Sequence, residues 1–263
     1  MVQEGIAGEL DTLEYLLDRA KRDAVPVRHA FVHDPRTGGG PGPLAGLMRR
    51  PDTLDLYLLL LAIAVRKPHN VQYPIAVYSR ALGRGSSKSA ELWVSKSLRW
   101  LDDAGLIARA KAGRELEIRL REDSSRKRAY KRPSTKDRWD WFFNLSHAYF
   151  LDGWHKRLSA PAKAVLLIAH CNESDFELNQ RRGEQWWGLS GDTLSRGLIE
   201  LQDLSLLSAR TITRKAPQSR AGYTLVPLYT LRPPFEKGKP GKRPPKTGRR
   251  KAATKGTRTR AAS

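Results

Sequence analysis

The same pattern of residues occurs twice in this chain, at a constant offset of 100 positions. Residues 94–107 are VSKSLRWLDDAGLI and residues 194–207 are LSRGLIELQDLSLL. In each copy a segment rich in β-branched and apolar residues follows, with a short basic turn in it. The repeat predicts two copies of one structural unit. The identical positions pair Ser95 with Ser195, Leu98 with Leu198, Leu101 with Leu201, Asp103 with Asp203 and Leu106 with Leu206.

Around the first copy the sequence predicts three helices followed by a β-hairpin. Asp52 is the expected cap of the first helix, Pro74 is tolerated in the first turn of the second helix, and Gly105 ends the third. A Lys-Ala-Gly-Arg turn joins the two strands. The predicted elements are helices over 52–65, 73–82 and 87–104, and strands over 107–110 and 115–121.

The second copy has the same predicted order. Ser159 is the expected cap of its first helix, which has Pro161 in its first turn. The dipeptide Ser190-Gly191 forms the turn before the third helix. The predicted elements are a helix over 159–170, an irregular polar insert over 172–183, helices over 184–189 and 192–204, and strands over 208–214 and 223–231.

The remaining segments are expected to flank or join these two units. The N-terminal region has the apolar spacing of a short helix over 9–21 and an irregular Gly- and Pro-rich loop over 34–43. A polar, basic linker over 122–137 leads to an aromatic segment over 139–154, which packs between the units as a helix or as a strand. The predicted domains are an N-terminal extension (1–50), a first domain (51–121), a linker with the aromatic segment (122–158), a second domain (159–234) and a disordered basic tail (235–263).

The net charge indicates a polyanionic partner. The formal charge of the chain is +21, and from Glu236 onward there are eleven Lys or Arg and one Glu, so the rest of the chain still carries +11. A basic body with a basic tail is typical of nucleic-acid binding. An anionic membrane surface and a merely solubilising charge are the alternatives. The tail is expected to add phosphate contacts and salt dependence but little specificity.

The sequence offers little for a membrane or disulfide protein. The longest apolar run, from Leu54 to Val65, is interrupted by Asp55 and is shorter than the ~20 residues of a spanning helix. The first ten residues do not have the pattern of a signal peptide. Cys171 is the only cysteine, so we expect no disulfide framework and no thiolate zinc site. These features predict a soluble cytoplasmic protein.

No pattern indicates catalysis. The segment from Gly83 to Ser89 has glycines, serines and a lysine but not the spacing of a phosphate loop, and it follows a helix rather than a strand. The adjacent His170 and Cys171 do not face each other on a helix. The histidines at 147 and 155 have no carboxylate cluster near them in sequence, and Trp186 and Trp187 are expected to pack in the core. We therefore predict no enzyme, no metal site and no cofactor.

The repeated unit resembles the winged-helix superfamily, of the kind found in MarR-like regulators. The third helix of those proteins has a pattern close to VSRxLxxLexxGLI, which is similar to both repeated segments. The resemblance covers residues 52–121 and 159–231. It implies a mostly α fold with small β-hairpin wings (α+β) and two winged helix-turn-helix domains in tandem. The two-domain architecture also resembles plasmid replication initiators, and the Arg-, Ala-, Leu- and Gly-rich composition is similar to uncharacterised helix-turn-helix proteins of actinobacteria.

The resemblance implies that the third helices enter the major groove and that the hairpins lie along the backbone or minor groove. Val94, Leu98 and Leu101 are expected to pack inward, as are the equivalent leucines of the second copy. Lys and Arg suit guanine edges or phosphates, and Ser suits phosphates. The candidate DNA-binding residues are Ser87, Lys88, Ser89, Glu91, Ser95, Lys96, Arg99, Lys111 and Arg114 in the first copy, and Asp192, Ser195, Arg196, Arg214, Lys215 and Arg220 in the second.

The predicted function is binding of double-stranded DNA at specific sites, as a nucleoid-associated transcriptional regulator with two DNA-binding domains. A replication initiator of a plasmid or mobile element needs the same surface and stays open as an alternative. A non-specific nucleoid protein, in which the tail dominates, is another. A fourth hypothesis is an interaction module that binds a protein or a second copy of the chain, with the aromatic segment as its surface.

Overall fold

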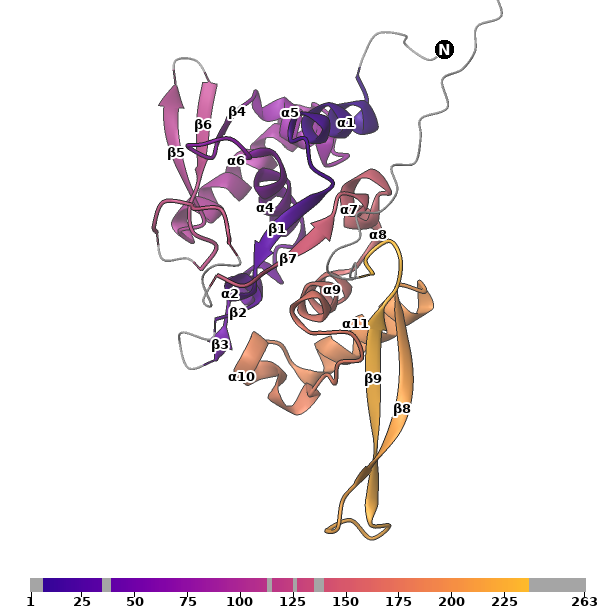
Figure 1. Ribbon diagram of the computed structural model, residues 1–263. Coiled ribbons are helices and arrows are strands. Elements are labelled where there is room, and N and C mark those ends of the chain that lie inside the picture. The colour runs from indigo at the N-terminus through magenta and orange to yellow at the C-terminus, as the bar shows by residue number, and fades with distance from the viewer. Residues whose placement is uncertain (1–6, 35–38, 113–114, 125–126, 135–139, 237–263) are drawn as a thin grey trace, which may run out of the picture.

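The chain folds into helices and small antiparallel sheets, which confirms the predicted α+β class. The computed structural model describes residues 7–34, 39–112, 115–124, 127–134 and 140–236 (Figure 1). The predicted disordered tail lies outside the described residues, apart from Phe235 and Glu236, and Arg114 lies outside them too.

Residues 51–120, the first unit, have the predicted order of three helices followed by a hairpin. The sequence patterns missed a short strand before the second helix, which pairs with β6 so that the sheet order is β4-β6-β5. Three residues are too few to show the alternation that marks a strand. The elements are α4 (Pro51–Ile63), β4 (Asn70–Gln72), α5 (Ile75–Ala81), α6 (Lys88–Asp103), β5 (Ile107–Ala112) and β6 (Glu115–Leu120).

Residues 159–231, the second unit, repeat this order. In the place of β4 a single antiparallel bridge joins Phe176 to Tyr229. The insert predicted to be irregular and polar is therefore partly ordered, because Phe176 and Leu178 are buried under the hairpin and the helices. The elements are α9 (Ala160–Cys171), the 3₁₀ turn η2 (Gln180–Arg182), α10 (Gly183–Trp187), α11 (Gly191–Asp203), β8 (Leu207–Lys215) and β9 (Tyr223–Leu231).

The N-terminal region and the aromatic segment together join the two units. Strand β1 (Ala24–Arg28) pairs antiparallel with β7 (Phe142–Ser146). β1 contacts α4 and β7 contacts α9, so this two-stranded sheet lies between the first helices of the two units (Figure 1). The aromatic segment is thus both strand and helix. The other elements of the joint are α1 (Glu9–Arg19), α2 (His29–Val32), β2 (His33–Asp34), β3 (Gly40–Pro41), α3 (Leu44–Leu47), α7 (Ala148–Leu151) and α8 (Trp154–Arg157).

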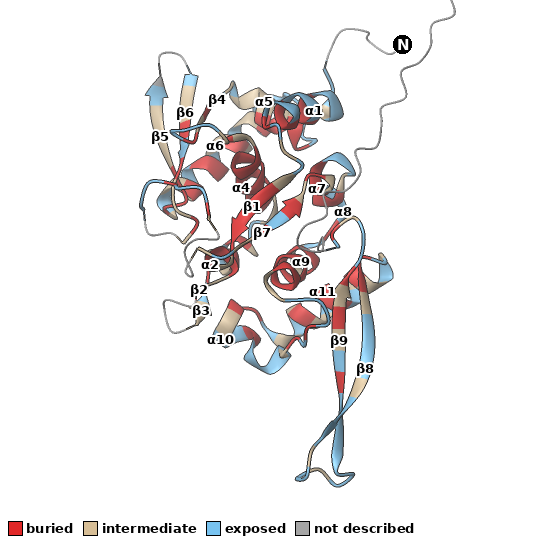
Figure 2. Ribbon diagram, in the orientation of Figure 1, coloured by how far each residue is buried: buried red, intermediate tan, exposed pale blue. Residues whose placement is uncertain are grey.

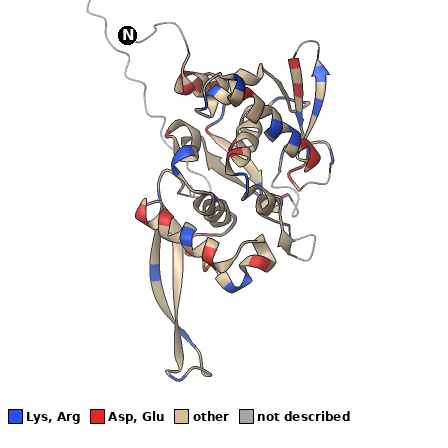
Figure 3. Ribbon diagram, turned by 180° about the vertical axis from the view of Figure 1, so that it is seen from behind, with Lys and Arg blue, Asp and Glu red and all other residues tan. Residues whose placement is uncertain are grey.

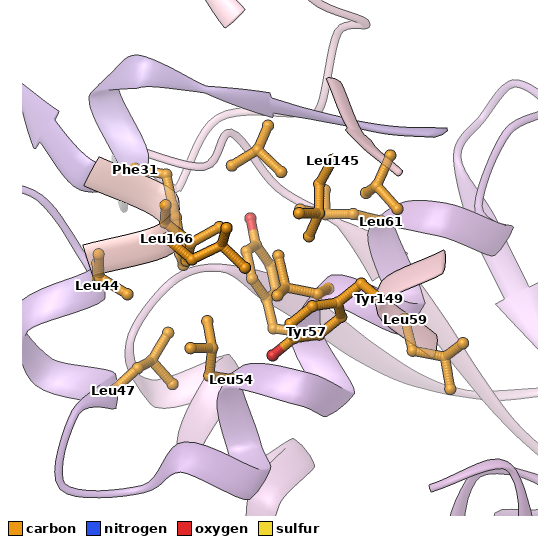
Figure 4. Close-up of a cluster of buried hydrophobic side chains, with 14 of the residues drawn as sticks. Phe31, Leu44, Leu47, Leu54, Tyr57, Leu59, Leu61, Leu145, Tyr149 and Leu166 are labelled. Carbon is orange, nitrogen blue, oxygen red and sulfur yellow. The ribbon is translucent and has the colours of Figure 1, made fainter. Parts of the chain in front are cut away.

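One hydrophobic core runs through both units and the joint. Helix α4 is apolar on every side, and such a helix is stable in water only when other elements surround it. Leu54 and Tyr57 of α4 lie in one cluster with Leu145 of β7 and Leu166 of α9 (Figure 4). The predicted domain boundaries therefore divide the chain into successive segments, but these segments share one buried core.

A buried ion pair links the first helices of the two units. The Lys163 ammonium on α9 donates to an Asp55 carboxylate oxygen on α4 at 2.6 Å, and the Tyr149 hydroxyl donates to the other oxygen at 2.6 Å. Burial raises the pKa of Asp55 to about 6, and the nearby Lys163 opposes that rise. Helix α4 was predicted from an apolar run with Asp52 as its cap, and Asp55 counted there only as an interruption of the run.

The predicted linker is anchored to the joint rather than solvated. The Arg28 guanidinium makes ion pairs with Asp123 and Asp140 and donates to the Lys131 carbonyl. The Arg28 amide donates to Asp123 at 3.0 Å, and Asp123 is fully buried. The segment was predicted to be a linker because it is polar and basic, but the cation that holds its buried carboxylate is about a hundred residues away in the chain.

The helix ends agree with the predictions at one cap and differ at another. Ser159 accepts a hydrogen bond from an amide in the first turn of α9, as expected. Ser87 caps α6 in the same way, although it was predicted only as a DNA contact. Helix α4 instead begins at Pro51 with Arg50 as its cap residue, so the predicted Asp52 cap is wrong. The 34–43 loop was expected to hold no regular structure, yet β2 and β3 pair across it.

Candidate nucleic-acid interface

The third helices α6 and α11 bury the same positions. From residue 91 to residue 104, every position has the same degree of burial as the position 100 residues later. Val94, Leu98 and Leu101 are buried, and so are Leu194, Leu198 and Leu201, which confirms the predicted inward faces. The opposite faces of both helices are open to a partner.

The outer face of α6 carries three exposed cations between its first residue and Arg99. Lys88, Ser89, Lys96 and Arg99 are exposed, and the three cations make no ion pair with any described residue. Leu92 lies among them and is 55% exposed. On this exposed face the helix presents three cations and one apolar side chain, which are the kinds of group that contact phosphates and base edges.

Two predicted α6 residues are less available than expected. Glu91 and Ser95 are only half-exposed, and the Ser95 hydroxyl donates to the Glu91 carbonyl at 2.9 Å. Ser87 is exposed, but its hydroxyl accepts the Ala90 amide as the helix cap. The Ser87 and Ser95 hydroxyls are therefore already used in hydrogen bonds within α6.

The outer face of α11 carries a different set of side chains. Arg196 makes an ion pair with Asp192 at 3.1 Å, one turn away on the same face. Ile199 stands where α6 has Arg99, and it is 58% exposed. The Ser195 hydroxyl donates to the Gly191 carbonyl and to the Gln180 side chain. The single exposed cation of this helix is therefore largely neutralised within its own surface.

Both third helices are seen from the same side of the molecule. Figure 3, which shows the molecule from behind, has Lys or Arg and Asp or Glu positions of α6 and α11 in view together.

The hairpins of the two units differ in length and in charge. Lys111 on β5 is exposed, while other cations of the first hairpin are paired: Arg109 with Asp102 at 3.1 Å and Arg119 with Glu117 at 2.8 Å. The hairpin is short and Arg114 at its turn is outside the described residues.

The second hairpin projects from the body as a long, exposed ribbon (Figures 1 and 2). Near its base Arg210 pairs with Asp175 at 3.1 Å, and farther out Arg214 pairs with Glu177 at 2.8 Å. Toward the tip Lys215 and Arg220 are exposed and form no ion pair with the described part of the chain. The predicted contacts Lys215 and Arg220 are thus available, whereas Arg214 is already engaged.

Leu92 and Ile199 were not among the predicted contacts, and neither were three residues outside the third helices. Arg84, in the turn before α6, pairs with Asp52 and lies over the Trp93 ring at 4.3 Å. Leu225 and Tyr223 are exposed apolar residues on the outer half of the ribbon. The position of Arg84 between two glycines could have indicated an exposed basic turn. Tyr223 and Leu225 could not be distinguished in the sequence from ordinary strand residues.

The histidines at 147, 155 and 170 are core residues, whereas Trp186 is only half-buried. Burial lowers the pKa of His147, and it lowers that of His155 to about 4. His170 and Trp187 are buried. Among the described residues, no group of three or more His, Cys, Asp or Glu side chains is placed to hold a metal ion.

The helices that the structure describes include none with both the length and the apolar character needed to cross a bilayer. Comparison with known proteins adds no assignment, since no family model, curated protein or solved structure matches the chain.

Proposed function

We propose that this protein binds double-stranded DNA at specific sites through α6, as a transcriptional regulator. The observation that carries the proposal is the outer face of α6, where Lys88, Lys96 and Arg99 are exposed and unpaired within the described residues. Unpaired cations on an exposed helix next to a basic hairpin suit the major groove and its phosphates.

The order of elements supports a winged-helix interpretation of each unit. In the first unit a strand separates the first two helices, and that strand completes a three-stranded sheet with the hairpin. The second unit has the same order, with the Phe176–Tyr229 bridge in place of that strand. In a winged helix the third helix is the one that enters the groove, which assigns this role to α6.

The second unit has a supporting role in this proposal. Because Asp192 neutralises Arg196, α11 offers DNA less charge than α6 does. The ribbon offers Lys215 and Arg220 near its tip, where they suit phosphates flanking the α6 site. DNA binding of this kind would place the protein on the nucleoid, in the cytoplasm.

The test is selection of genomic DNA fragments by the purified full chain at about 150 mM salt, a concentration near the physiological ionic strength. A regulator should enrich a few sites with an affinity on the order of 10³-fold or more above random DNA. Clustered, repeated sites would instead support a replication initiator. Uniform retention would support a nucleoid protein and reject site-specific binding.

The enriched site then tests the role of α6. The double variant Lys96→Ala, Arg99→Ala should raise the Kd for that site by roughly a hundredfold, at about 1–3 kcal/mol per lost contact. The matched control Arg128→Ala, Lys131→Ala removes the same charge from exposed residues between the units. Equal effects of the two double variants would mean that charge alone binds DNA and would reject readout by α6.

A further inference from the structure

A cavity of about 410 Å³ lies at the joint, apart from the third helices and the hairpins. Its walls come from the start of β7, from the C-terminal end of α9 and the residues after it, and from the segment that follows β9. It therefore touches the joint and both ends of the second unit.

A continuous series of aromatic rings lines this cavity. The Trp141 ring meets the His29 ring edge-on at 6.1 Å, and His29 lies 6.0 Å from Phe143. Phe143 stacks on His170 at 5.1 Å, and His170 meets Phe235 edge-on at 6.3 Å. Such ring walls bind flat apolar groups and also bind cations through the ring faces.

Trp141 is the ring most open to a ligand. Its side chain is 61% exposed, and the Trp141 carbonyl accepts the His29 amide at 2.8 Å, which fixes the backbone beside the cavity. A large exposed indole on a fixed backbone is costly for a surface with no partner, and it is a common feature of ligand sites.

The charge of the cavity is opposite to that of the protein. The lining includes the carboxylates of Glu173 and Glu236, and none of the described residues that line it is Lys or Arg. The whole sequence has 48 Lys and Arg against 27 acids. Among the described residues that line the cavity, the two carboxylates therefore favour a cationic ligand over an anionic one.

We propose that this cavity is a binding site for a small organic cation that carries an aromatic ring. The exposed Trp141 ring would stack on the flat group and attract the ammonium, while Glu173 and Glu236 would balance its charge. This site does not depend on the proposed DNA binding.

The experiment is a titration of the full chain with three probes that share one ring, followed through the Trp141 indole NMR signal. Trp141→Phe assigns that signal. Benzylammonium should bind with a Kd that is roughly millimolar, as suits a ligand of this size. Benzyl alcohol should bind about tenfold more weakly, and benzoate should show no saturable binding. Equal binding of the three probes, or preference for benzoate, would overturn the proposal.

Two variants test the named residues. Glu173→Gln should remove most of the preference for benzylammonium over benzyl alcohol. Trp141→Ala should weaken both probes, and for this variant, which lacks the indole signal, binding is followed through the NMR signals of the probes themselves. Glu115→Gln and Tyr15→Ala are the matched controls, because both residues are exposed and neither lines the cavity. Both test residues lie at the surface, so the variants should fold. A Glu173→Gln protein that keeps the full preference for the cation would overturn the proposal.

Discussion

Helices α6 and α11 bury the same positions but present different side chains to solvent. The equivalent inward leucines are conserved between the copies, whereas Leu92 and Arg99 of α6 correspond to Asp192 and Ile199 of α11. Burial restricts the inner face to apolar residues of similar size, and the outer face is free of that restriction. The internal repeat therefore corresponds to a shared order of elements, and the two copies differ in the side chains that they expose.

The first helices of the two units differ in a complementary way. Helix α4 carries Asp55 and α9 carries Lys163, so each buried charge is stabilised by the other unit. Neither unit could bury its charge alone without a large desolvation cost. Because of this buried ion pair, the stability of each unit depends on the other.

The largest effect is expected from breaking that pair. Lys163→Met should lower the free energy of unfolding by about 3–5 kcal/mol, because Asp55 stays buried without its cation. Urea denaturation of the full chain measures the loss. Lys156→Met is the matched control, since Lys156 pairs with Glu9 at the surface at 2.7 Å and should cost under about 1 kcal/mol.

Two outcomes would contradict mutual stabilisation of the units. One is an equal loss for the buried and the surface lysine. The other is a wild-type denaturation curve with two separate steps, one for each unit, since one shared core should unfold in one step.

The next effect concerns the contact between the first and third helices. Gly197 lets α11 approach α9 closely: a Cβ there would lie 2.4 Å from the Pro161 carbonyl oxygen. The equivalent Ser97 in α6 fits and bonds with the Thr53 hydroxyl at 3.1 Å. Gly197→Ser, which makes the second unit like the first, should therefore cost about 1–3 kcal/mol through overpacking.

Urea denaturation again provides the measurement, with the exposed Ile199→Ser as control. A Gly197→Ser protein as stable as this control would mean that α11 can move away from α9 at no cost, and that the two helix pairs are packed alike.

A smaller effect should distinguish the outer faces. Lys96→Ala should raise the Kd for the selected DNA site roughly fivefold, or about 1 kcal/mol. Arg196→Ala, at the same position of the repeat, should change it less than about twofold, because Asp192 already neutralises that cation. Fluorescence anisotropy with labelled DNA measures both. A larger loss for Arg196→Ala would reverse the proposed roles of α6 and α11.

The smallest effect lies at the ends of these helices. Gly105 and Ser205 occupy equivalent positions after α6 and α11, with φ of 75° and 58°. Glycine adopts this left-handed conformation freely and serine does not. Ser205→Gly should therefore stabilise the protein by about 0.5–1 kcal/mol, and Gly105→Ser should destabilise it. Thermal unfolding measures both, and a loss of stability in Ser205→Gly would show that the Ser205 side chain makes a contact of its own.

Local sequence patterns were enough to predict the elements that depend on residues close together in the chain. Both third helices, their inward leucines and the Ser159 cap could be predicted, because helical spacing and capping act within a few residues of each other. The proposed α6 contacts Lys88, Lys96 and Arg99 follow from the same spacing, since the exposed face is the one opposite the leucines.

Which cations form ion pairs, and how the two units are joined, could be seen only in the tertiary structure. Asp55 and Lys163 meet 108 residues apart, and Arg28 reaches Asp123 across 95 residues. Arg214, a predicted DNA contact, instead pairs with Glu177, and this ion pair also joins segments that are distant in the sequence. Charge pairs and cavity walls depend on contacts between elements far apart in the chain, and no local pattern records them.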